Sequence, residues 1–356
     1  MQKQLGATLK LENGMEFKGF SFGHTESVSG DVVFSTAMVG YPEQLTDATY
    51  SGQILCLSYP LVGNYGVPSE EVTAEGLSLH LDSDRIHPRG LIIFDYCEKY
   101  SNWAACKSLE QWMKEQKLTG IYGIDTRELT KVIRDNGSMK GVIIPEGAEA
   151  VEFAQTCENP VACVSCTEPV TYKGEGKKVV LVDCGVKHSI IRGLLARGVE
   201  VIRVPYNYDF TSMEYDGVYV SNGPGDPAAC TETVEILKKV LATDKPVFGL
   251  NLGYLLVARA AGCETAKLAR PHRSANQPVR KTGSNRAYIT SQNAAYTVVE
   301  NSIPSDWEVI FTNLNDGSVD GIRNKNKTQM GANFNPEVCI GLNENFTLID
   351  EFISKL

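Results

Sequence analysis

The sequence predicts an α/β protein with two domains, a β-rich α/β domain followed by a doubly wound, mostly parallel sheet. Two patterns and the chain length support this expectation. Short strand-like runs punctuated by Gly, Pro and Asn dominate the beginning of the chain. After residue 178, β-branched runs of buried-strand type alternate with helical segments, which is typical of a parallel sheet with right-handed crossovers. At 356 residues the chain is long enough for two hydrophobic cores.

The boundary between the two domains is expected in a linker at residues 167–177. This segment, TEPVTYKGEGK, holds Pro, Gly and charged residues but little apolar content. The first domain then covers residues 1–166, and the second covers residues 178–356.

Composition and charge narrow the class of protein. Hydrophobic residues make up 42% and charged residues 22% of the chain, as in ordinary soluble proteins. The net charge of −9 disfavours a general surface for nucleic acid or anionic membranes. The first residues, MQKQLGATLKLENG, lack a signal-peptide core, and no run reaches the roughly 18 apolar residues of a membrane span. We therefore expect a cytoplasmic protein.

The ten cysteines indicate reduced thiols rather than a disulfide framework, because no secretory signal accompanies them. Cys157, Cys163 and Cys166 are close in sequence, but a zinc site would need a fourth ligand and none lies near. Buried or incidental thiols are favoured over a metal or redox centre, and the role of these three cysteines stays open.

The first domain is expected to open with a β-hairpin. Ala7–Leu11 and Met15–Phe20 flank Asn13-Gly14, a dipeptide typical of a tight hairpin turn. Residues 40–47, GYPEQLTD, are expected to form a polar, turn-rich loop. Further strands are expected at residues 31–36, 53–59 and 90–96, and helices at residues 108–116 and 128–134.

The second domain is expected to alternate strands and helices. The strands are expected at residues 178–183, 199–204, 217–221 and 246–250, and the helices at residues 188–197, 231–242 and 254–261. Ligands of such sheets bind beyond the carboxyl ends of the strands, which makes residues 222–227 and Asn251 candidate site positions. The glycines of NGPGDP can present backbone N–H groups to an oxyanion or a carboxylate, although a plain tight turn is the simpler interpretation.

The turn around Asn251 has the pattern of a site built for nucleophilic chemistry. Gly249 and Gly253 stand two residues before and after Asn251, and a sharp strand-to-helix turn with a strained central residue needs small neighbours at those positions. Hydrolases place Ser or Cys at that centre. A carboxamide cannot act as a nucleophile, so the residue that would perform the chemistry is missing. An ordinary strand–turn–helix is the competing interpretation.

Taken together, the motifs resemble the small subunit of carbamoyl-phosphate synthetase over nearly the whole chain. That family joins an N-terminal domain of its own to a class I glutamine amidotransferase domain, which implies the amidotransferase type for the second sheet. The matching motifs of the N-terminal half are TAMVGYPE at 36–43, LTD at 45–47, YP at 59–60, GNYG at 63–66, SNW at 101–103 and GIDTR at 123–127. Those of the C-terminal half are VDCGVK at 182–187, SNGPGDP at 221–227, GLNLG at 249–253, ITSQN at 289–293, NDG at 315–317 and FNPE at 334–337.

The departures from the family pattern fall on the catalytic positions. Where the family has Gly-Ile-Cys-Leu-Gly-His-Gln, this chain has Asn251 for the nucleophilic Cys and Leu255 for the Gln that binds substrate. Where the family has Phe-His-Pro-Glu, Asn335 replaces the base and Glu337 keeps the orienting carboxylate. Because thiolate and imidazole are lost together, the resemblance implies that glutamine hydrolysis is lost.

Other pocket positions leave weak glutamine binding open. The positions that the family uses around glutamine are Thr49, Gly223, Gly225, Leu252, Leu255, Asn293, Ala295 and Tyr296. Polar partners are missing at Leu255 and Ala294, which argues against tight recognition. A substitute nucleophile is disfavoured, because Cys184, Cys230 and Cys339 do not lie at the turn. None of the five histidines is evidently near: His24, His80, His87, His188 and His272.

Three functions are compared. The favoured one is a small subunit that docks on the large subunit, which would make carbamoyl phosphate from bicarbonate, ATP and free ammonia. No cofactor is then expected in this chain, and ATP and magnesium are expected on the large subunit. The alternative is a non-catalytic protein that senses an amino acid or binds another partner, and the third is an amidotransferase with unconventional residues. The pathway (arginine or pyrimidine), an intact paralogue and the higher oligomeric state stay open.

Overall fold

The computed structural model describes residues 5–153, 157–326, 328–335 and 347–356. The chain divides into two compact units, Met1–Cys157 and Glu158–Leu356. This division differs from the expected linker at 167–177, because that segment contains β12 (Val170–Tyr172), which pairs with β14 (Glu200–Pro205) in the sheet of the second unit. Its composition suggested a linker, but its backbone hydrogen bonds make it a sheet edge.

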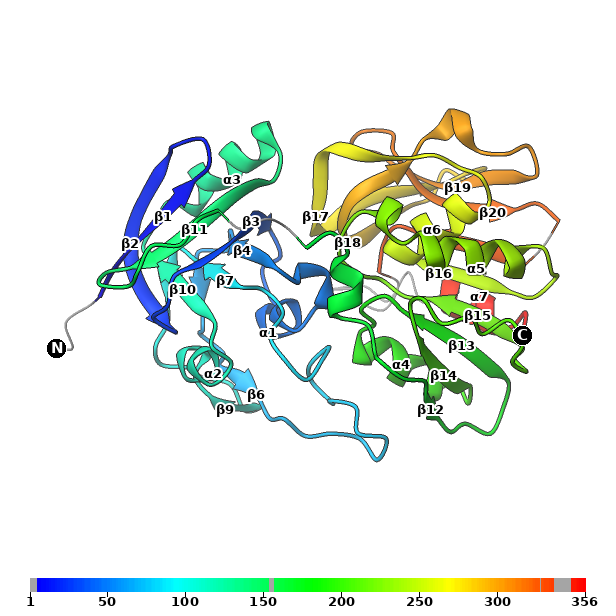
Figure 1. Ribbon diagram of the computed structural model, residues 1–356, viewed down its shortest axis with the longest axis horizontal. Coiled ribbons are helices and arrows are strands. Elements are labelled where there is room, and N and C mark those ends of the chain that lie inside the picture. Colours follow the sequence, from blue (N-terminus) through cyan, green and yellow to red (C-terminus); the bar gives the residue numbers. More distant parts are fainter. Residues whose placement is uncertain (1–4, 154–156, 327, 336–346) are drawn as a thin grey trace. The chain divides into compact units, whose positions relative to one another are not determined.

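The first unit is built around a closed barrel with the strand order β1-β11-β3-β4-β7-β10-β2 (Figure 1). The predicted hairpin is confirmed, since β1 and β2 pair antiparallel with Leu9 opposite Phe17. The barrel strands are β1 (Gly6–Leu11), β2 (Glu16–Gly23), β3 (Val28–Ser35), β4 (Gln53–Leu57), β7 (Gly90–Ile92), β10 (Thr119–Tyr122) and β11 (Met139–Pro145). Two short pairs accompany it, β5 (Leu61–Val62) with β8 (Asp95–Tyr96) and β6 (Val67–Pro68) with β9 (Ala105–Lys107).

Residues 40–47 are not the loop that the sequence predicts. The helix α1 (Tyr41–Leu45) forms there, followed by a 3₁₀ turn at Ala48–Tyr50. Pro42 lies in the first turn, where its missing N–H costs no hydrogen bond, and Tyr41 and Leu45 are buried. Burial of these two side chains outweighs the turn-like composition of the segment.

The other two helices of this unit confirm the predicted ones. They are α2 (Leu109–Glu115) and α3 (Thr126–Asn136). Each begins after a residue whose side-chain oxygen accepts hydrogen bonds from the first turn, Ser108 for α2 and Asp125 for α3.

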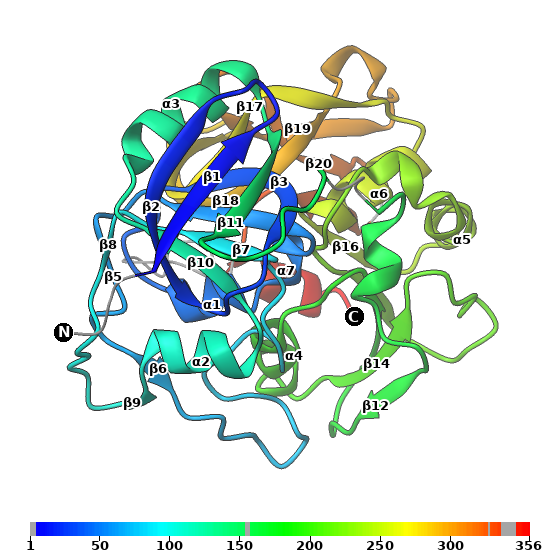
Figure 2. The same cartoon turned by 60° about the vertical axis from the view of Figure 1, so that its left-hand side comes forward.

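The second unit contains one sheet of ten strands in the order β12-β14-β13-β15-β16-β21-β20-β18-β17-β19 (Figures 1 and 2). Its central strands run parallel, which confirms the doubly wound α/β class. These strands are β14, β13 (Lys178–Asp183), β15 (Gly217–Val220), β16 (Val247–Leu250) and β21 (Gln329–Ala332). The helices are α4 (His188–Leu195), α5 (Thr231–Leu241), α6 (Leu252–Ala260) and α7 (Thr347–Ile353).

Beyond β21 the sheet continues in antiparallel strands for which the sequence analysis set no elements. They are β17 (Thr265–Lys281), β18 (Ala287–Val298), β19 (Trp307–Asn313) and β20 (Val319–Asn324). The first two form a long hairpin whose register shifts twice, between Lys267 and His272 and between Ser274 and Gln277. Such irregularities mask the two-residue period that identifies a strand in a sequence.

The helix α6 is central to the core of the second unit. Its residues from Leu252 to Ala258 are all buried, so the helix is covered on every side over that length. Among the residues that the structure describes, no helix combines the length and the apolar character needed to cross a bilayer.

Candidate functional site

The turn between β16 and α6 has the strained backbone that the sequence predicts. Asn251 has φ 52° and ψ −111°. Within the described part of the chain, Lys117 is the only other non-glycine residue with a positive φ. The N–H of Asn251 donates to the carbonyl oxygen of Ala332 at 2.9 Å, and the N–H of Leu255 donates to the carbonyl oxygen of Asn251 at 3.1 Å. The neighbouring strand and the first turn of α6 together hold this conformation.

Glycine is required on both sides of Asn251, because neither position has room for a Cβ atom. A Cβ at Gly249 would lie 2.6 Å from the carbonyl oxygen of Gly253, and a Cβ at Gly253 would collide with the carbonyl oxygen of Val220. Backbone packs directly against backbone at both positions, and it cannot move aside as a flexible side chain would. We call Gly249–Gly253 the elbow.

The side chain of Asn251 is buried and hydrogen-bonded. It is 6% exposed, and its Nδ2 donates to the carbonyl oxygen of Asn293 on β18 at 3.1 Å. The carboxamide has no ionisable proton and no nucleophilic lone pair on nitrogen. The centre of the elbow is therefore occupied by a neutral group that is hydrogen-bonded to β18.

Asn335 attaches to the same strand. It lies three residues after the end of β21, and its N–H donates to the carbonyl oxygen of Ser291 at 3.0 Å. Its side chain is 6% exposed, and its Oδ1 has no hydrogen-bond partner among the described residues. Because Ser291 and Asn293 are two residues apart on β18, the two attachment points lie about 7 Å apart. Glu337 and Cys339 fall outside the described residues.

The glycine loop at 222–227 lies at the carboxyl end of β15, beside the elbow. Gly253 donates its N–H to the carbonyl oxygen of Ser221 at 3.0 Å, which joins the two segments. A Cβ at Gly223 would collide with the carbonyl oxygen of Cys184, and Gly225 has φ 94°. The hydroxyl of Tyr296 donates to Asp226 Oδ2 at 3.2 Å, so one pocket candidate contacts the glycine loop.

The candidate positions are divided between the two compact units. Leu252 and Leu255 are buried in the core, with exposures of 2% and 3%, and Ala295 lies on β18 two residues after Asn293. Thr49 is buried in the first unit, where its N–H donates to Asp47 Oδ1 at 2.9 Å. Thr49 therefore belongs to a different compact unit from the rest of the set.

His272, Cys184 and Cys230, which were considered for a substitute catalytic role, are all buried. His272 has both ring nitrogens engaged, Nδ1 at 2.9 Å from Gln292 Oε1 and Nε2 at 2.8 Å from Asp316 Oδ2. Burial raises the pKa of the Cys184 thiol well above its usual range and that of Cys230 to about 11. Protonated thiols of this kind are poor nucleophiles.

Behind β18 lies a buried polar cluster that the sequence analysis missed. Its members are His272, Gln292, Asn313, Asp316 and Asp320, and we call it the buried network. Asp320 is fully buried, and its Oδ2 accepts from Gln292 Nε2 at 2.7 Å and from Asn313 Nδ2 at 3.1 Å. Burial raises the pKa of Asp320 to about 6, although these two hydrogen bonds act in the opposite direction. The members lie on four strands and in the turn between β19 and β20, so no local sequence pattern marks the cluster.

The three clustered cysteines do not form a described metal site. Cys157 and Cys163 are exposed, and Cys166 is partly exposed. Within the described ranges, no group of three or more His, Cys, Asp or Glu side chains is arranged to hold a metal ion.

Comparisons with known proteins agree with the division of the chain. A family model described as carbamoyl-phosphate synthase small chain, CPSase domain, matches residues 9–143. A model described as glutamine amidotransferase class-I matches residues 180–355. The first match lies within the first compact unit, and the second lies within the second unit.

Named relatives match over almost the whole chain. It is 44% identical over 355 residues to a Homo sapiens protein named carbamoyl-phosphate synthase (ammonia), mitochondrial, with coverage of 98% of this chain and 24% of that protein. It is 44% identical over 372 residues to multifunctional protein pyr1-3 of Dictyostelium discoideum, with coverage of 98% and 17%. The chain thus spans a quarter or less of the length of these relatives. A solved structure of a glutamine amidotransferase from Thermotoga maritima covers 46% of this chain and 76% of its own at 14% identity, with a TM-score of 0.37.

Proposed function

This chain belongs to the family of the carbamoyl-phosphate synthase small chain, with its class-I glutamine amidotransferase domain, and from this premise we propose that it serves carbamoyl-phosphate synthesis without hydrolysing glutamine. In this proposal it docks on the synthase part, which makes carbamoyl phosphate from bicarbonate, ATP and free ammonia. ATP and magnesium would bind to that synthase part. The N-terminal unit, which matches the small-chain model, is the proposed docking unit.

The observation that carries the proposal is the pair of amides at the catalytic positions. Glutamine hydrolysis needs a thiolate to attack the side-chain amide and an imidazole to accept and return the proton. Asn251 stands at the centre of the elbow with its amide donating to Asn293, and Asn335 occupies the position that the resemblance to the family assigns to the base. Neither side chain titrates, so neither can take part in proton transfer or acyl transfer.

Two further observations support free ammonia as the nitrogen source. The printed name of the Homo sapiens relative specifies ammonia. Leu255, at the position where the family's Gln contacts substrate, is packed into the core and offers no polar atom to a glutamine side chain. An amide substrate would leave its own polar groups without partners there.

The experiment measures carbamoyl-phosphate formation by the purified chain with its cognate synthase part, with glutamine and with ammonium as alternative nitrogen sources. We expect product with ammonium only, in a larger amount when this chain is present. Product formed from glutamine would overturn the loss of hydrolysis. The glutaminase activity of the chain alone is measured in parallel, and the expected ammonia release equals the buffer blank.

An amino-acid sensor without a synthase partner is the competing function. In the same experiment, a sensor would give no increase in product with either nitrogen source and no complex on a sizing column. A complex together with ammonium-dependent stimulation would exclude it.

A further inference from the structure

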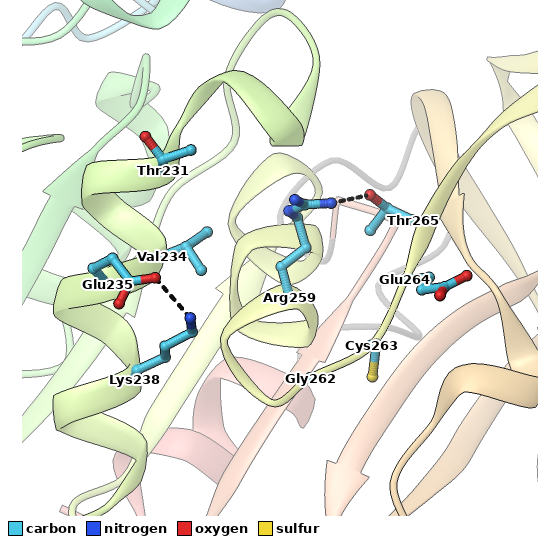
Figure 3. Close-up of a pocket in the computed structure, with 9 residues that line it drawn as sticks. All are labelled: Thr231, Val234, Glu235, Lys238, Arg259, Gly262, Cys263, Glu264 and Thr265. Atoms are coloured by element: carbon cyan, nitrogen blue, oxygen red, sulfur yellow. Dashed lines mark hydrogen bonds and ion pairs between the residues drawn. The ribbon is translucent and has the colours of Figure 1, made fainter.

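A cavity lies at the end of α6 opposite to the elbow. Its volume is about 430 Å³, within the range of small-molecule sites. The lining residues come from α5, from the last turn of α6, from the turn that follows α6 and from the start of β17 (Figure 3). Arg259 is eight residues along the helix from Asn251, which corresponds to about 12 Å. The cavity is therefore separate from the candidate functional site.

Arg259 brings an unneutralised charge to this cavity. Its Nη1 donates to Thr265 Oγ1 at 3.0 Å, while its Nε is shielded from solvent and has no partner among the described residues. It also forms no ion pair within the described part of the chain. Arginines elsewhere in this unit do, as in Arg203–Asp183 at 2.6 Å and Arg323–Glu308 at 2.7 Å. A guanidinium with most of its five donors unused is complementary to a carboxylate or phosphate.

Lys238, on the side of the cavity formed by α5, is a second cation. Lys238 and Glu235 project from α5 toward Arg259 (Figure 3), and Lys238 Nζ lies 2.6 Å from Glu235 Oε1. Both side chains are more than half exposed, and an ion pair of that kind contributes little stability. Lys238 is therefore free to turn toward an anion in the cavity.

The floor of the cavity adds no negative charge. Val234 and Cys263 are buried there, and burial raises the pKa of the Cys263 thiol to about 11, which keeps it protonated near neutral pH. The acidic lining residues are Glu235 and Glu264. The two carboxylates offset the two cations in total charge, which disfavours a polyphosphate, so a bound anion depends on direct contact with Arg259 and Lys238.

We propose that this cavity binds a small organic anion through a carboxylate or phosphate group held by Arg259 and Lys238. The site is independent of glutamine chemistry and of any synthase partner. It would place a ligand against the C-terminal end of the same helix whose N-terminal end forms the elbow.

The test follows thermal unfolding of the whole chain with potassium phosphate, with potassium succinate, and with potassium chloride at equal ionic strength. We expect phosphate or succinate to raise the unfolding midpoint by about 3 °C over chloride at saturation. A shift with phosphate alone identifies the phosphate source, and a shift with succinate alone identifies the carboxylate source. Equal midpoints in all three salts would overturn the proposal.

Substitutions of charged residues test whether the anion binds in this cavity. Arg259→Gln is expected to abolish the shift, whereas Arg270→Gln, at an exposed position on β17, is expected to keep it. If Arg259→Gln does not fold, Lys238→Gln replaces it, because its side chain is half exposed and makes only a surface ion pair. Lys238→Gln is expected to reduce the shift at least twofold. An unchanged shift in both lining variants would refute the site.

Discussion

The elbow and the strand β18 beside it are held by different forces. The elbow is maintained by close steric packing, because the backbone at Gly249 and Gly253 lies directly against other backbone atoms. No charged group takes part. The strand depends on buried polar contacts, with the buried network behind it and the attachments of Asn251 and Asn335 on it. The elbow therefore needs no reactive side chain at its centre, because steric fit maintains its backbone.

The largest expected effect comes from Gly253→Ala, which breaks the elbow. The new Cβ would collide with the carbonyl oxygen of Val220, so we expect a loss of about 3 kcal/mol or more in the free energy of unfolding. Urea unfolding of the second unit measures it. Gly193→Ala in α4 is the matched control, since its Cβ would meet only the end of Arg197, and we expect it to be neutral or stabilising. Wild-type stability in Gly253→Ala would contradict the steric account.

Asp320→Asn tests the buried polar contacts that hold β18. The test uses the pH dependence of the free energy of unfolding. The folded-state pKa of Asp320 is raised to about 6 from 3.8, so the folded state binds more protons than the unfolded state between these values. This carboxyl therefore contributes stability below about pH 4 that is lost as the pH rises through 6. We expect Asp320→Asn to remove this decline and to gain about 1–3 kcal/mol at pH 7.

Unfolding in urea at a series of pH values measures this effect. Asp316→Asn, at an exposed edge of the same network, serves as the comparison and is not expected to reproduce the gain, because Asp316 accepts from Ser318 and lies against His272. Parallel pH profiles for wild type and Asp320→Asn would contradict the assignment.

Substitution of Asn251 separates strain from hydrogen bonding. Asn251→Ala loses the bond to Asn293 and keeps a side chain at φ 52°, so we expect a loss of about 1–2 kcal/mol. Asn251→Gly loses the same bond but relieves the strain, so it should be more stable than Asn251→Ala by about 1 kcal/mol. The difference between the two variants in chemical unfolding measures the strain. Equal stabilities would mean that the elbow is unstrained.

The smallest expected effect is that of Asn251→Cys on activity. The thiol returns to the elbow, but Asn335 supplies no imidazole to accept its proton, so we expect no ammonia release from glutamine above wild type. Asn251→Cys combined with Asn335→His is the control that restores both groups. Release by the single variant would show that another base serves the elbow.

Much of the second unit could be predicted because its strands are local apolar runs that end in glycine turns. The strained turn at Asn251 followed from Gly249 and Gly253 alone, since few other arrangements need small residues on both sides. The proposal that Asn251 and Asn335 stand at catalytic positions rests on the motifs around them and stays a prediction. In each of these cases, a few neighbouring residues carry the physical constraint.

Features that depend on distant partners could not be predicted. Residues 40–47 read as a loop because Gly, Pro and Asp dominate locally, yet burial of Tyr41 and Leu45 makes a helix. The buried network unites residues from 272 to 320, and the bulges of β17 hide its strand period. The cavity at Arg259 likewise combines α5 with β17, and its signal is an unpaired charge that only the fold reveals.

The short edge strand β12 has a consequence for handling the second unit alone. Val170–Tyr172 cover one side of β14, whose other side pairs with β13. A fragment that begins at residue 178 would leave that side of β14 bare, and exposed strand edges recruit further strands and promote aggregation. A fragment that begins at residue 158 retains the cover and is the better choice for soluble expression.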